Sequence, residues 1–549
     1  MKMDEKTAIK RLIAQYESLA SAKATRLSYW QSLHEYTFSH KAALTAAFTM
    51  ASRPHAEKYD SSGMLNAARC AASMYTHLTP SSQWFLLAAP PGSEAAADRG
   101  YTDSLADRAE QLHLAFAQTN FATEMHSAYE DLLSGTACVA VKRQEESPFS
   151  LSTRPLGEYC FACNEEGVPE AVFVERQLTA FEAADLFGSE KLAAPIRTAL
   201  KDMADSVFTE KAAYLNVMRP NDKSTPAAIA SGAPYENLWI ERAGGNVIKR
   251  GGNKRLRYII SRFWKPTGMD WGMGPSDMAY PSIRCMDKFM EVVLKYAAKA
   301  MNPPSLWPDD GAFHPMSTAP GAVIVGRMGA GDLGHPQLMQ LQTDHRLAQY
   351  LVEYYGNQVA QCYFAQIFQT LADSGHKTAY EVATVLQKDY DLAIPVVGRQ
   401  QRELFAPLVR VCLELMTEWE LGIHGWQLHG ETLGEYDYQL ELISPLALAI
   451  KYQELQKLPN LVALLSPLAE MDPGVWDHYS LNDISRGIGE SMGVPKSWKR
   501  SAYEVRQIQE ARRAGLARRE FLENAQAGAR AAKDASGPVA ADSVLRGVA

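Results

Sequence analysis

Two stretches with apolar residues at helical spacing flank a segment rich in proline and glycine. The first predicts a helix that begins near Pro281 and ends at Asn302-Pro303-Pro304. Its apolar positions are Ile283, Met286, Met290, Val293, Leu294, Ala297 and Met301. The second predicts a helix from roughly Asp344 to Phe368, with apolar or aromatic positions at Leu347, Leu351, Tyr354, Tyr355, Val359, Cys362 and Phe364. The pattern therefore predicts a hairpin of two long helices around an insert with strands of its own.

The chain before this hairpin alternates between helical and strand-like patterns. The segment Tyr258–Trp264 is β-branched and aromatic, which predicts a strand leading into the first long helix. Helices are expected at 7–50, 61–78, 102–134 and 178–203. Strands are expected at 84–87, 137–143, 149–155, 159–162 and 171–176 and within 213–263, where loops are expected at 221–234 and 243–253. Asn164–Gly167 predicts a hairpin turn.

The chain after the hairpin returns to helix. Leu371–Lys377 breaks the helical pattern, and Thr378 with Glu381 three residues later predicts a capping box. The helical pattern then continues past Arg399 to Leu421. A strand is expected at 438–443, followed by helix to about Lys533. The predicted fold class is α+β with helix predominating.

Composition places the chain among globular proteins with two or three cores. It has 549 residues, of which 46% are hydrophobic and 21% charged, and a formal net charge of −8. This charge argues against a protein that grips nucleic acid through a basic face. Seven scattered cysteines, a polar N-terminus and the lack of a membrane-length apolar run lead us to expect a soluble intracellular product without a disulfide framework.

No motif names a reaction. The segment Gly329–Gly334 fits G-x-G-x-x-G, but His335-Pro336 interrupts the helix that a dinucleotide site requires, so a glycine loop is favoured. Cys160 and Cys163 have redox spacing but lie in strand-like sequence, which favours buried structural cysteines. The sequence has no phosphate-binding loop, no H-E-x-x-H and no G-x-S-x-G. We therefore assign no catalytic residue, cofactor or metal, and we expect an architectural protein rather than an enzyme.

The segment 499–533 is rich in alanine and arginine. Its arginines would suit contact with nucleic acid, whereas the glutamates among them favour an exposed, ion-paired helix. Both interpretations stay open.

Several short blocks occur in an order that is typical of one family. They are Arg26–Tyr36, Asp60–Leu87, Asp131–Ala137, Lys377–Val382, Ser444–Ala447 and Gly493–Pro495. Through these blocks the chain resembles the portal, or head-to-tail connecting, proteins of short-tailed double-stranded DNA bacteriophages, from about Leu12 to Arg513. It departs from the family pattern in the 221–234 insert, the segment between the two long helices and the C-terminal tail.

The resemblance implies the portal fold, assembled as a ring of twelve subunits. In it, residues 1–256 would form the N-terminal wing, and 257–301 the strand and first stem helix. The clip would be 302–342, the second stem helix 343–369 and the tunnel loop 370–377. Residues 378–450 would return to the wing, and 451–549 would form the helical crown and tail.

The resemblance also implies three groups of site residues. A tunnel loop facing DNA would comprise Asp373, Ser374, Gly375, His376 and Lys377. A clip docking surface would comprise Pro303, Pro304, Trp307, Pro308, Asp309 and Asp310. Packing between stem subunits would involve Met286, Met290, Val293, Leu294, Leu351 and Tyr355. Two alternatives stay open: Trp307 as a packing residue within the ring, and the loop as an ordinary corner between helices.

The implied role is passive: a channel for packaging and ejecting the genome at one capsid vertex. The implied partners are copies of the chain, double-stranded DNA bound without sequence preference, the major capsid protein, scaffolding or internal core proteins, the terminase large subunit and a tail adaptor or tube protein, with no membrane. The protein would reside in the virion after assembly in the host cytoplasm. The alternatives are a ring-forming tail or connector protein that is not a portal, and an enzyme with an unrecognised active site.

Overall fold

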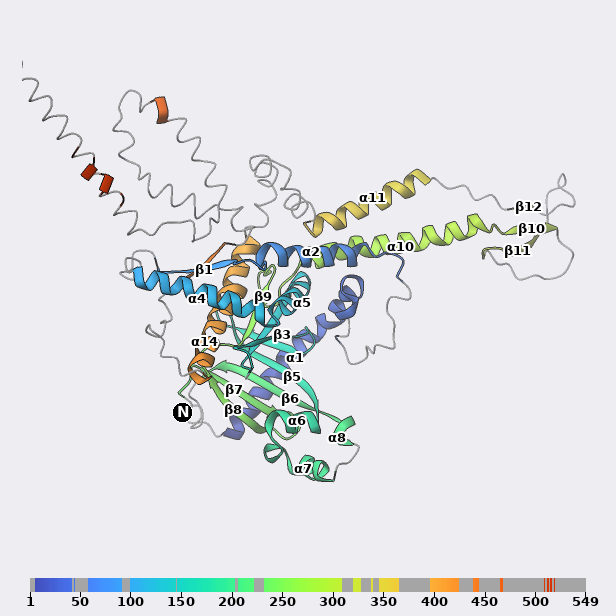
Figure 1. Cartoon of the computed structure of the whole chain (residues 1–549). Coiled ribbons are helices and arrows are strands. Elements are labelled where there is room, and N and C mark those ends of the chain that lie inside the picture. The colour runs from blue at the N-terminus through green and yellow to red at the C-terminus, as the bar shows by residue number, and fades with distance from the viewer. Residues whose placement is uncertain are drawn as a thin grey trace, which may run out of the picture. The chain divides into compact units, whose positions relative to one another are not determined.

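The structure is a computed structural model. It describes residues 5–41, 44, 58–90, 99–144, 146–202, 206–221, 232–308, 319–326, 337–338, 345–364, 395–423, 438–443 and 465–467, together with six single positions between 508 and 518. The chain divides into two compact units, Met1–Gln453 and Glu454–Ala549. The first unit contains nearly all of the described residues (Figure 1).

Three helices of the N-terminal region contribute to the main hydrophobic core: α2 (Ser62–Leu78), α4 (Arg99–Gln118) and α5 (Phe121–Leu133). Helix α1 (Glu5–Thr37) places its buried apolar residues in two further clusters, one around Trp30 and Leu33 and one around Leu12 and Tyr16. The core centres on Trp84, which is fully buried and stacks with Phe116 and Phe121. The helical pattern predicted over 102–134 is confirmed, and the structure divides it into two helices at Thr119-Asn120. There the Asn120 amide exchanges two hydrogen bonds, 2.8 and 3.0 Å long, with the backbone of Leu151, a contact that local periodicity does not reveal.

Two antiparallel sheets form the strand-rich part of the unit. The smaller has the order β3-β2-β9, built from β2 (Thr136–Lys142), β3 (Ser150–Thr153) and β9 (Tyr258–Arg262). The larger has the order β4-β5-β6-β7-β8, with bounds Tyr159–Cys163, Pro169–Thr179, Lys211–Pro220, Tyr235–Glu241 and Asn246–Asn253. The hairpin turn predicted between β4 and β5 is confirmed, with Gly167 in the left-handed region at φ 76°.

Two predictions in this region need correction. The loop expected at 243–253 is mostly strand, because β8 (Asn246–Asn253) pairs with β7 along its length, with one register shift between Trp239 and Ile240. The helix expected over 178–203 is preceded by β5, which continues to Thr179, and is divided into α6 (Ala180–Phe187) and α7 (Ala194–Lys201). A short helix α8 (Ser206–Thr209) follows. Thr179 and Glu182 form a capping box that starts α6, so side-chain chemistry rather than apolar spacing sets that boundary.

The two predicted long helices are present, but their ends differ from the predicted ones. Helix α10 spans Pro275–Met301, so the prediction of a start at Pro281 was wrong and Pro281 lies inside the helix. Gly274 precedes it in extended backbone, and the Gly274 amide donates to the Asp277 carboxylate at 2.7 Å. Helix α11 spans His345–Cys362 and stops short of the predicted Phe368, because Phe364 adopts φ 55° with its ring beside Phe263.

Five further strands and a helix belong to the described part of the chain. Between α10 and α11 lies a three-stranded sheet of β10 (Ser305–Pro308), β11 (Val323–Gly326) and β12 (Gln337–Leu338), which confirms strands in the insert. Strand β1 (Phe85–Ala88) pairs with β13 (Gln439–Leu442). The strands predicted at 84–87 and 438–443 are thereby confirmed. A helix that the structure describes from residue 395 onward passes through a π-helical turn, η4 (Gln401–Phe405), into α14 (Ala406–Ile423).

Candidate functional site

The base of helix α10 is held tightly against the rest of the unit. Glycine is required at Gly274, because a Cβ there would lie 2.1 Å from the Leu133 carbonyl oxygen. The Asp287 carboxylate accepts backbone N–H groups of Tyr59 and Asp60 at 2.7 and 3.2 Å. The buried residues of α10 all lie between Pro275 and Asp287. The first half of this helix is therefore fixed by its own chain.

The second half of α10 and much of α11 carry apolar side chains that remain exposed to solvent in a single chain. The two helices pack on each other, with the Ser282 hydroxyl donating to the Gln358 side chain at 3.2 Å (Figure 1). The exposed fractions are 62% for Val292, 47% for Leu294, 87% for Met301, 57% for Leu347, 62% for Tyr350 and 45% for Tyr354. Large apolar side chains gathered on two neighbouring helices are a feature of surfaces that another polypeptide covers.

The sheet after α10 presents a tryptophan. Trp307 lies on β10 with 47% of its surface exposed, and its indole N–H donates to the Ser305 hydroxyl at 3.0 Å. The chain returns beside α10, where the Gly321 amide donates to the Asn302 carbonyl at 2.9 Å. A tryptophan held in this way combines a large contact area with little freedom to lose on binding.

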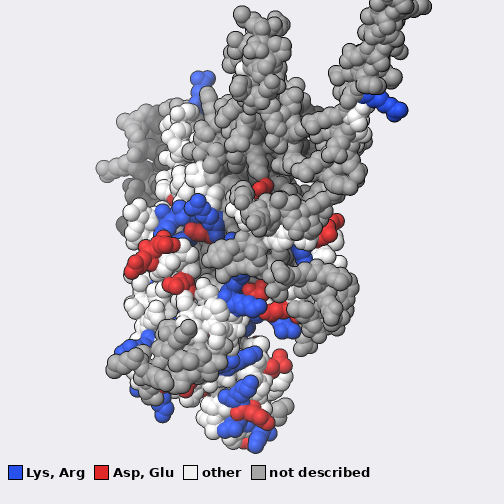
Figure 2. Space-filling model, turned by 90° about the vertical axis from the view of Figure 1, so that its left-hand side faces the viewer, with Lys and Arg blue, Asp and Glu red and all other residues white. Residues whose placement is uncertain are grey.

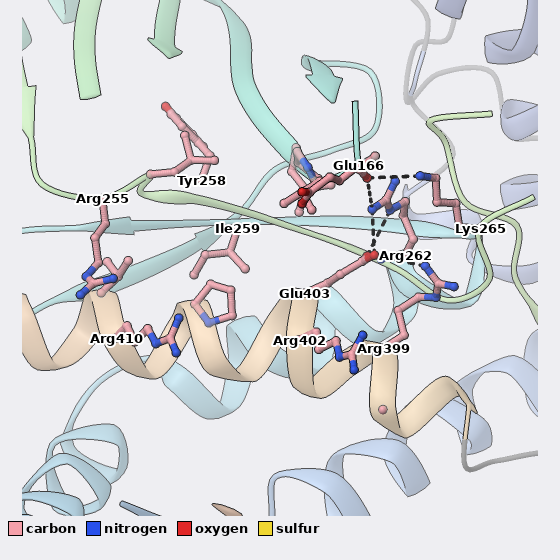
Figure 3. A pocket seen from close by; sticks show the side chains of 18 of the residues that line it. Glu166, Arg255, Tyr258, Ile259, Arg262, Lys265, Arg399, Arg402, Glu403 and Arg410 are labelled. Atoms are coloured by element: carbon pink, nitrogen blue, oxygen red, sulfur yellow. Dashed lines mark hydrogen bonds and ion pairs between the residues drawn. The ribbon is translucent and has the colours of Figure 1, made fainter. Parts of the chain in front are cut away.

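A basic cleft opens between the sheets and the helix that leads into α14. Its volume is about 780 Å³, and its walls are the β4–β5 turn, the β8–β9 connection with β9, and residues 395–411 (Figure 3). Seven cationic side chains line it: Lys254, Arg255, Arg262, Lys265, Arg399, Arg402 and Arg410. Among the described residues, only two acidic side chains do so, Glu166 and Glu403. The described part of the lining therefore has a formal charge of about +5, the seven cations less the two acids, in a chain of net charge −8.

A buried ion pair holds this cleft together. Arg262 is 1% exposed, and its guanidinium reaches the Glu403 carboxylate at 2.8 and 3.1 Å. The same carboxylate accepts the Arg262 backbone N–H at 2.9 Å. Beside it, the Gln400 amide donates to the Arg262 carbonyl at 2.9 Å. Residues 400 and 403 lie at the π-helical turn, so this irregular turn joins the helix to β9.

Comparison with known proteins assigns the architecture to a family. The family described as "Bacteriophage head to tail connecting protein" matches residues 9–498. The chain belongs to this family. It is 22% identical over 510 residues to the "Probable portal protein" of Bordetella phage BPP-1, covering 90% of this chain and 89% of the relative. It is 21% identical over 544 residues to the "Portal protein" of Salmonella phage epsilon15, covering 96% of each.

These names describe a connecting or portal role rather than a catalytic one, in agreement with the sequence-based expectation of a structural protein. Among the described residues, no group of three or more His, Cys, Asp or Glu side chains is arranged to hold a metal ion. No helix in the described part of the chain is long and apolar enough to cross a bilayer. All seven cysteines are free, and Cys160 is buried. On the face shown in Figure 2, acidic and basic side chains are interspersed among the described residues.

The predicted site residues of this connecting protein fall into described and undescribed groups. Among the stem residues, Met286 is buried at 5% exposure, Leu294 is open, and Met290, Val293, Leu351 and Tyr355 are half-buried. In the clip group, Pro304 is buried, Pro303 is half-buried and Pro308 ends β10. Outside the described residues lie Asp309, Asp310, the tunnel loop Asp373–Lys377, the glycine motif 329–334, the capping box 378–381 and most of the 221–234 insert.

Sequence reasoning missed the basic cleft entirely. Its residues come from four separate stretches between 166 and 411. The arginines at 399, 402 and 410 follow helical spacing and were a usable signal for an arginine-rich face. Nothing in the sequence indicated that the β8–β9 connection would bring further cations to the same face.

One buried cluster of ionisable groups bears on the enzyme alternative. The Lys41 ammonium lies 3.1 Å from the Glu130 carboxylate and 2.9 Å from that of Asp131. Burial raises the pKa of Asp131, which is 3% exposed. None of these three residues lines the basic cleft. With its carboxylates directed at a lysine, the cluster is suited to joining η1 (Ser39–Lys41) to α5.

His34 beside this cluster makes stability depend on pH. Its ring is buried, its Nδ1 lies 3.3 Å from the Lys41 carbonyl, and burial lowers its pKa to about 4. Between pH 6.5 and 4 the unfolded chain binds the proton and the folded chain does not, so stability falls as pH falls. This one site is expected to remove roughly 2–3 kcal/mol between pH 7 and 4.5.

The test compares the wild type with His34→Phe by urea unfolding at pH 7 and 4.5, at one protein concentration. The variant should lose less stability over this interval than the wild type. The raised pKa of Asp131 acts in the opposite direction at acid pH and is common to both proteins. Equal losses in the two proteins would contradict a neutral buried imidazole.

Proposed function

We propose that this connecting protein forms a closed ring of twelve copies that serves as a portal at one capsid vertex. The observation that carries the proposal is the open apolar surface of α10 and α11, since one chain leaves Val292, Leu294 and Tyr350 uncovered. Membership of the head-to-tail connecting family supports a role for this surface in assembly. Identical copies meeting head to tail through such a surface form a ring when the rotation closes.

The charge of the chain suits a conduit for double-stranded DNA. Twelve copies at −8 give a formal charge of about −96. Each phosphate that pairs with Lys or Arg adds salt-dependent affinity, which opposes sliding. A predominantly acidic ring therefore lets duplex DNA pass in either direction, for packaging and for ejection, without sequence preference. The sequence has no phosphate-binding loop, so in this proposal a separate motor supplies the energy.

The partners follow from this position. The ring would contact the major capsid protein and scaffolding or internal core proteins on its periphery. Its clip, residues 302–342, would dock first the terminase large subunit and later a tail adaptor or tube protein. The protein would assemble in the host cytoplasm and remain in the virion.

The mass of the purified assembly tests the ring. Twelve chains of 60.7 kDa give about 728 kDa, against 60.7 kDa for a monomer. Native mass spectrometry at micromolar concentration should find the closed ring, alone or after addition of capsid partners. A protein that stays monomeric under both conditions would overturn the proposal. A ring that binds neither motor nor capsid proteins would favour a tail or connector component that is not a portal.

Trp307→Ala tests the clip as a docking surface. Because the indole is about half exposed and bonds only within β10 among the described contacts, its loss should leave the ring intact. Binding to the motor or the adaptor should weaken by about 2 kcal/mol or more, as expected for a tryptophan anchor. Surface plasmon resonance against each partner measures this. Failure of the variant to form rings would show that Trp307 packs one subunit against the next.

Lys377→Glu tests the proposed tunnel loop, residues 373–377. The loop breaks a helical pattern at Gly375, where glycine costs about 1 kcal/mol relative to alanine in a helix interior. One lysine per subunit would supply a weak, repeated phosphate contact that holds DNA against slippage. Rings should assemble, while packaging stalls or packaged genomes leak in a salt-dependent manner. Particles with normal genome length would identify the segment as an ordinary corner.

A further inference from the structure

The basic cleft combines accessible arginines with a lining that its own carboxylates do not neutralise. Arg402 is exposed and Arg410 is half-buried, and neither forms an ion pair with a described carboxylate. The other guanidinia have partners: Arg262 and Arg399 bind Glu403, and Arg255 lies 3.5 Å from Glu414. Among the arginines of the lining, Arg402 and Arg410 are therefore the ones that an incoming anion would meet.

The local backbone conformation indicates a preorganised binding site rather than a chance cluster of cations. The π-helical turn η4 contains Arg402 and Glu403. Single π turns inside α-helices are rare overall, and those that occur are often found at functional sites. Through this turn Glu403 faces the buried Arg262, while Arg402 lines the opening (Figure 3). The exposed arginine is thus presented from a braced element, so little ordering is needed when it binds.

We propose that this cleft is the docking site for an acidic peptide segment of a partner polypeptide. Guanidinium groups bind carboxylates through paired hydrogen bonds. The volume of about 780 Å³ lies in the range of roughly 300–1,000 Å³ that holds a small ligand or a few peptide residues. Leu256, Pro395 and Pro407 add apolar surface between the cations, which suits a segment with aliphatic as well as acidic side chains.

The lining favours peptide over nucleic acid. Single-stranded nucleic acid is held by stacking bases on aromatic faces. Two tyrosines line the cleft, but Tyr258 is 8% exposed and its hydroxyl donates to the Asn216 side chain at 2.9 Å. Tyr235 is half-buried at the start of β7 and is the remaining aromatic ring among the described lining residues. One partly covered ring does not make a stacking platform.

The distance between Arg402 and Arg410 indicates how far apart the carboxylates of the bound segment lie. Arg402 and Arg410 are eight residues apart, or about 12 Å at 1.5 Å per helical residue. An extended peptide advances about 3.3 Å per residue, so carboxylates about four residues apart would reach both arginines. The site does not depend on the proposed ring, because every residue in it comes from one chain.

The experiment measures binding of a labelled probe to the full-length protein by fluorescence anisotropy. The probe is a nonapeptide with glutamate at its first, fifth and ninth positions and leucine and serine between them. It should bind the wild type, and the same peptide with glutamine should not. Arg402→Ala/Arg410→Ala should weaken binding at least about tenfold. Arg402→Lys keeps the positive charge but loses the paired N–H donors of the guanidinium, so it should cause an intermediate loss of affinity.

Arg197→Ala is the matched control, since Arg197 is an exposed arginine of α7 outside the cleft. It should leave the affinity unchanged. Thermal unfolding of the double variant should match the wild type, because neither arginine is buried or paired with a described acid. Three results would each overturn the proposal: no peptide binding, binding that the double variant retains, or tighter binding of an oligothymidylate of the same charge. The last would assign the cleft to nucleic acid.

Discussion

Replacing Glu403 by alanine is expected to destabilise the protein by about 3–5 kcal/mol, the cost of leaving one member of a buried ion pair without its partner. Arg262 would keep its hydrogen bonds to the Asp270 and Gly167 carbonyl oxygens, at 3.2 and 2.9 Å. It would lose both guanidinium contacts to the carboxylate, and its backbone N–H would lose its acceptor. Urea unfolding at one protein concentration measures the change.

The control lies on the same helix. Glu418→Ala removes a glutamate 3.9 Å from Arg257, in a pair whose side chains are 22% and 34% exposed, and should cost less than about 1 kcal/mol. Arg262→Leu/Glu403→Leu should recover part of the loss, because no unpaired charge remains buried. If Glu403→Ala costs no more than Glu418→Ala, the Arg262–Glu403 pair does not join the helix to β9.

Leu294→Glu/Leu347→Glu is expected to convert the proposed ring into monomers. Both leucines are about half exposed in one chain, so each chain should fold normally. At a subunit interface, the same changes remove burial of the exposed half of each leucine, about 0.8–1.5 kcal/mol apiece, and place carboxylates in a desolvated surface. The penalty recurs at every interface of a closed ring. Native mass spectrometry should show 60.7 kDa in place of the assembly.

Gln361→Glu is the control for added charge. Gln361 is exposed on α11, and its replacement introduces a carboxylate without removing an apolar side chain. Rings of this variant should persist. Rings that survive the double leucine substitution would show that the exposed apolar surface of α10 and α11 does not form the interface, and the proposed ring would then need another contact surface.

Much of the element order is readable from the sequence because it depends on local periodicity. The alternation at 258–264, the helical stripes of both long helices and the turn at 164–167 each reflect which face of a short segment is buried. The order of the blocks from Arg26 to Pro495 indicated the family that the comparison then confirmed. The surplus of acidic over basic residues, on which the conduit argument depends, is also a property of composition alone.

The tertiary structure decided where elements begin and end and which distant residues meet. Helix α10 begins at Pro275 because the Gly274 backbone fits against Leu133, and the 102–134 helix breaks because Asn120 binds Leu151. Periodicity also cannot separate apolar residues covered by their own chain, such as Met286, from those left open, such as Leu294. The basic cleft exists only because a π-helical turn and the Arg262–Glu403 pair bring residues 166 to 411 together. Such contacts join positions far apart in the chain, and local sequence carries no record of their distance in space.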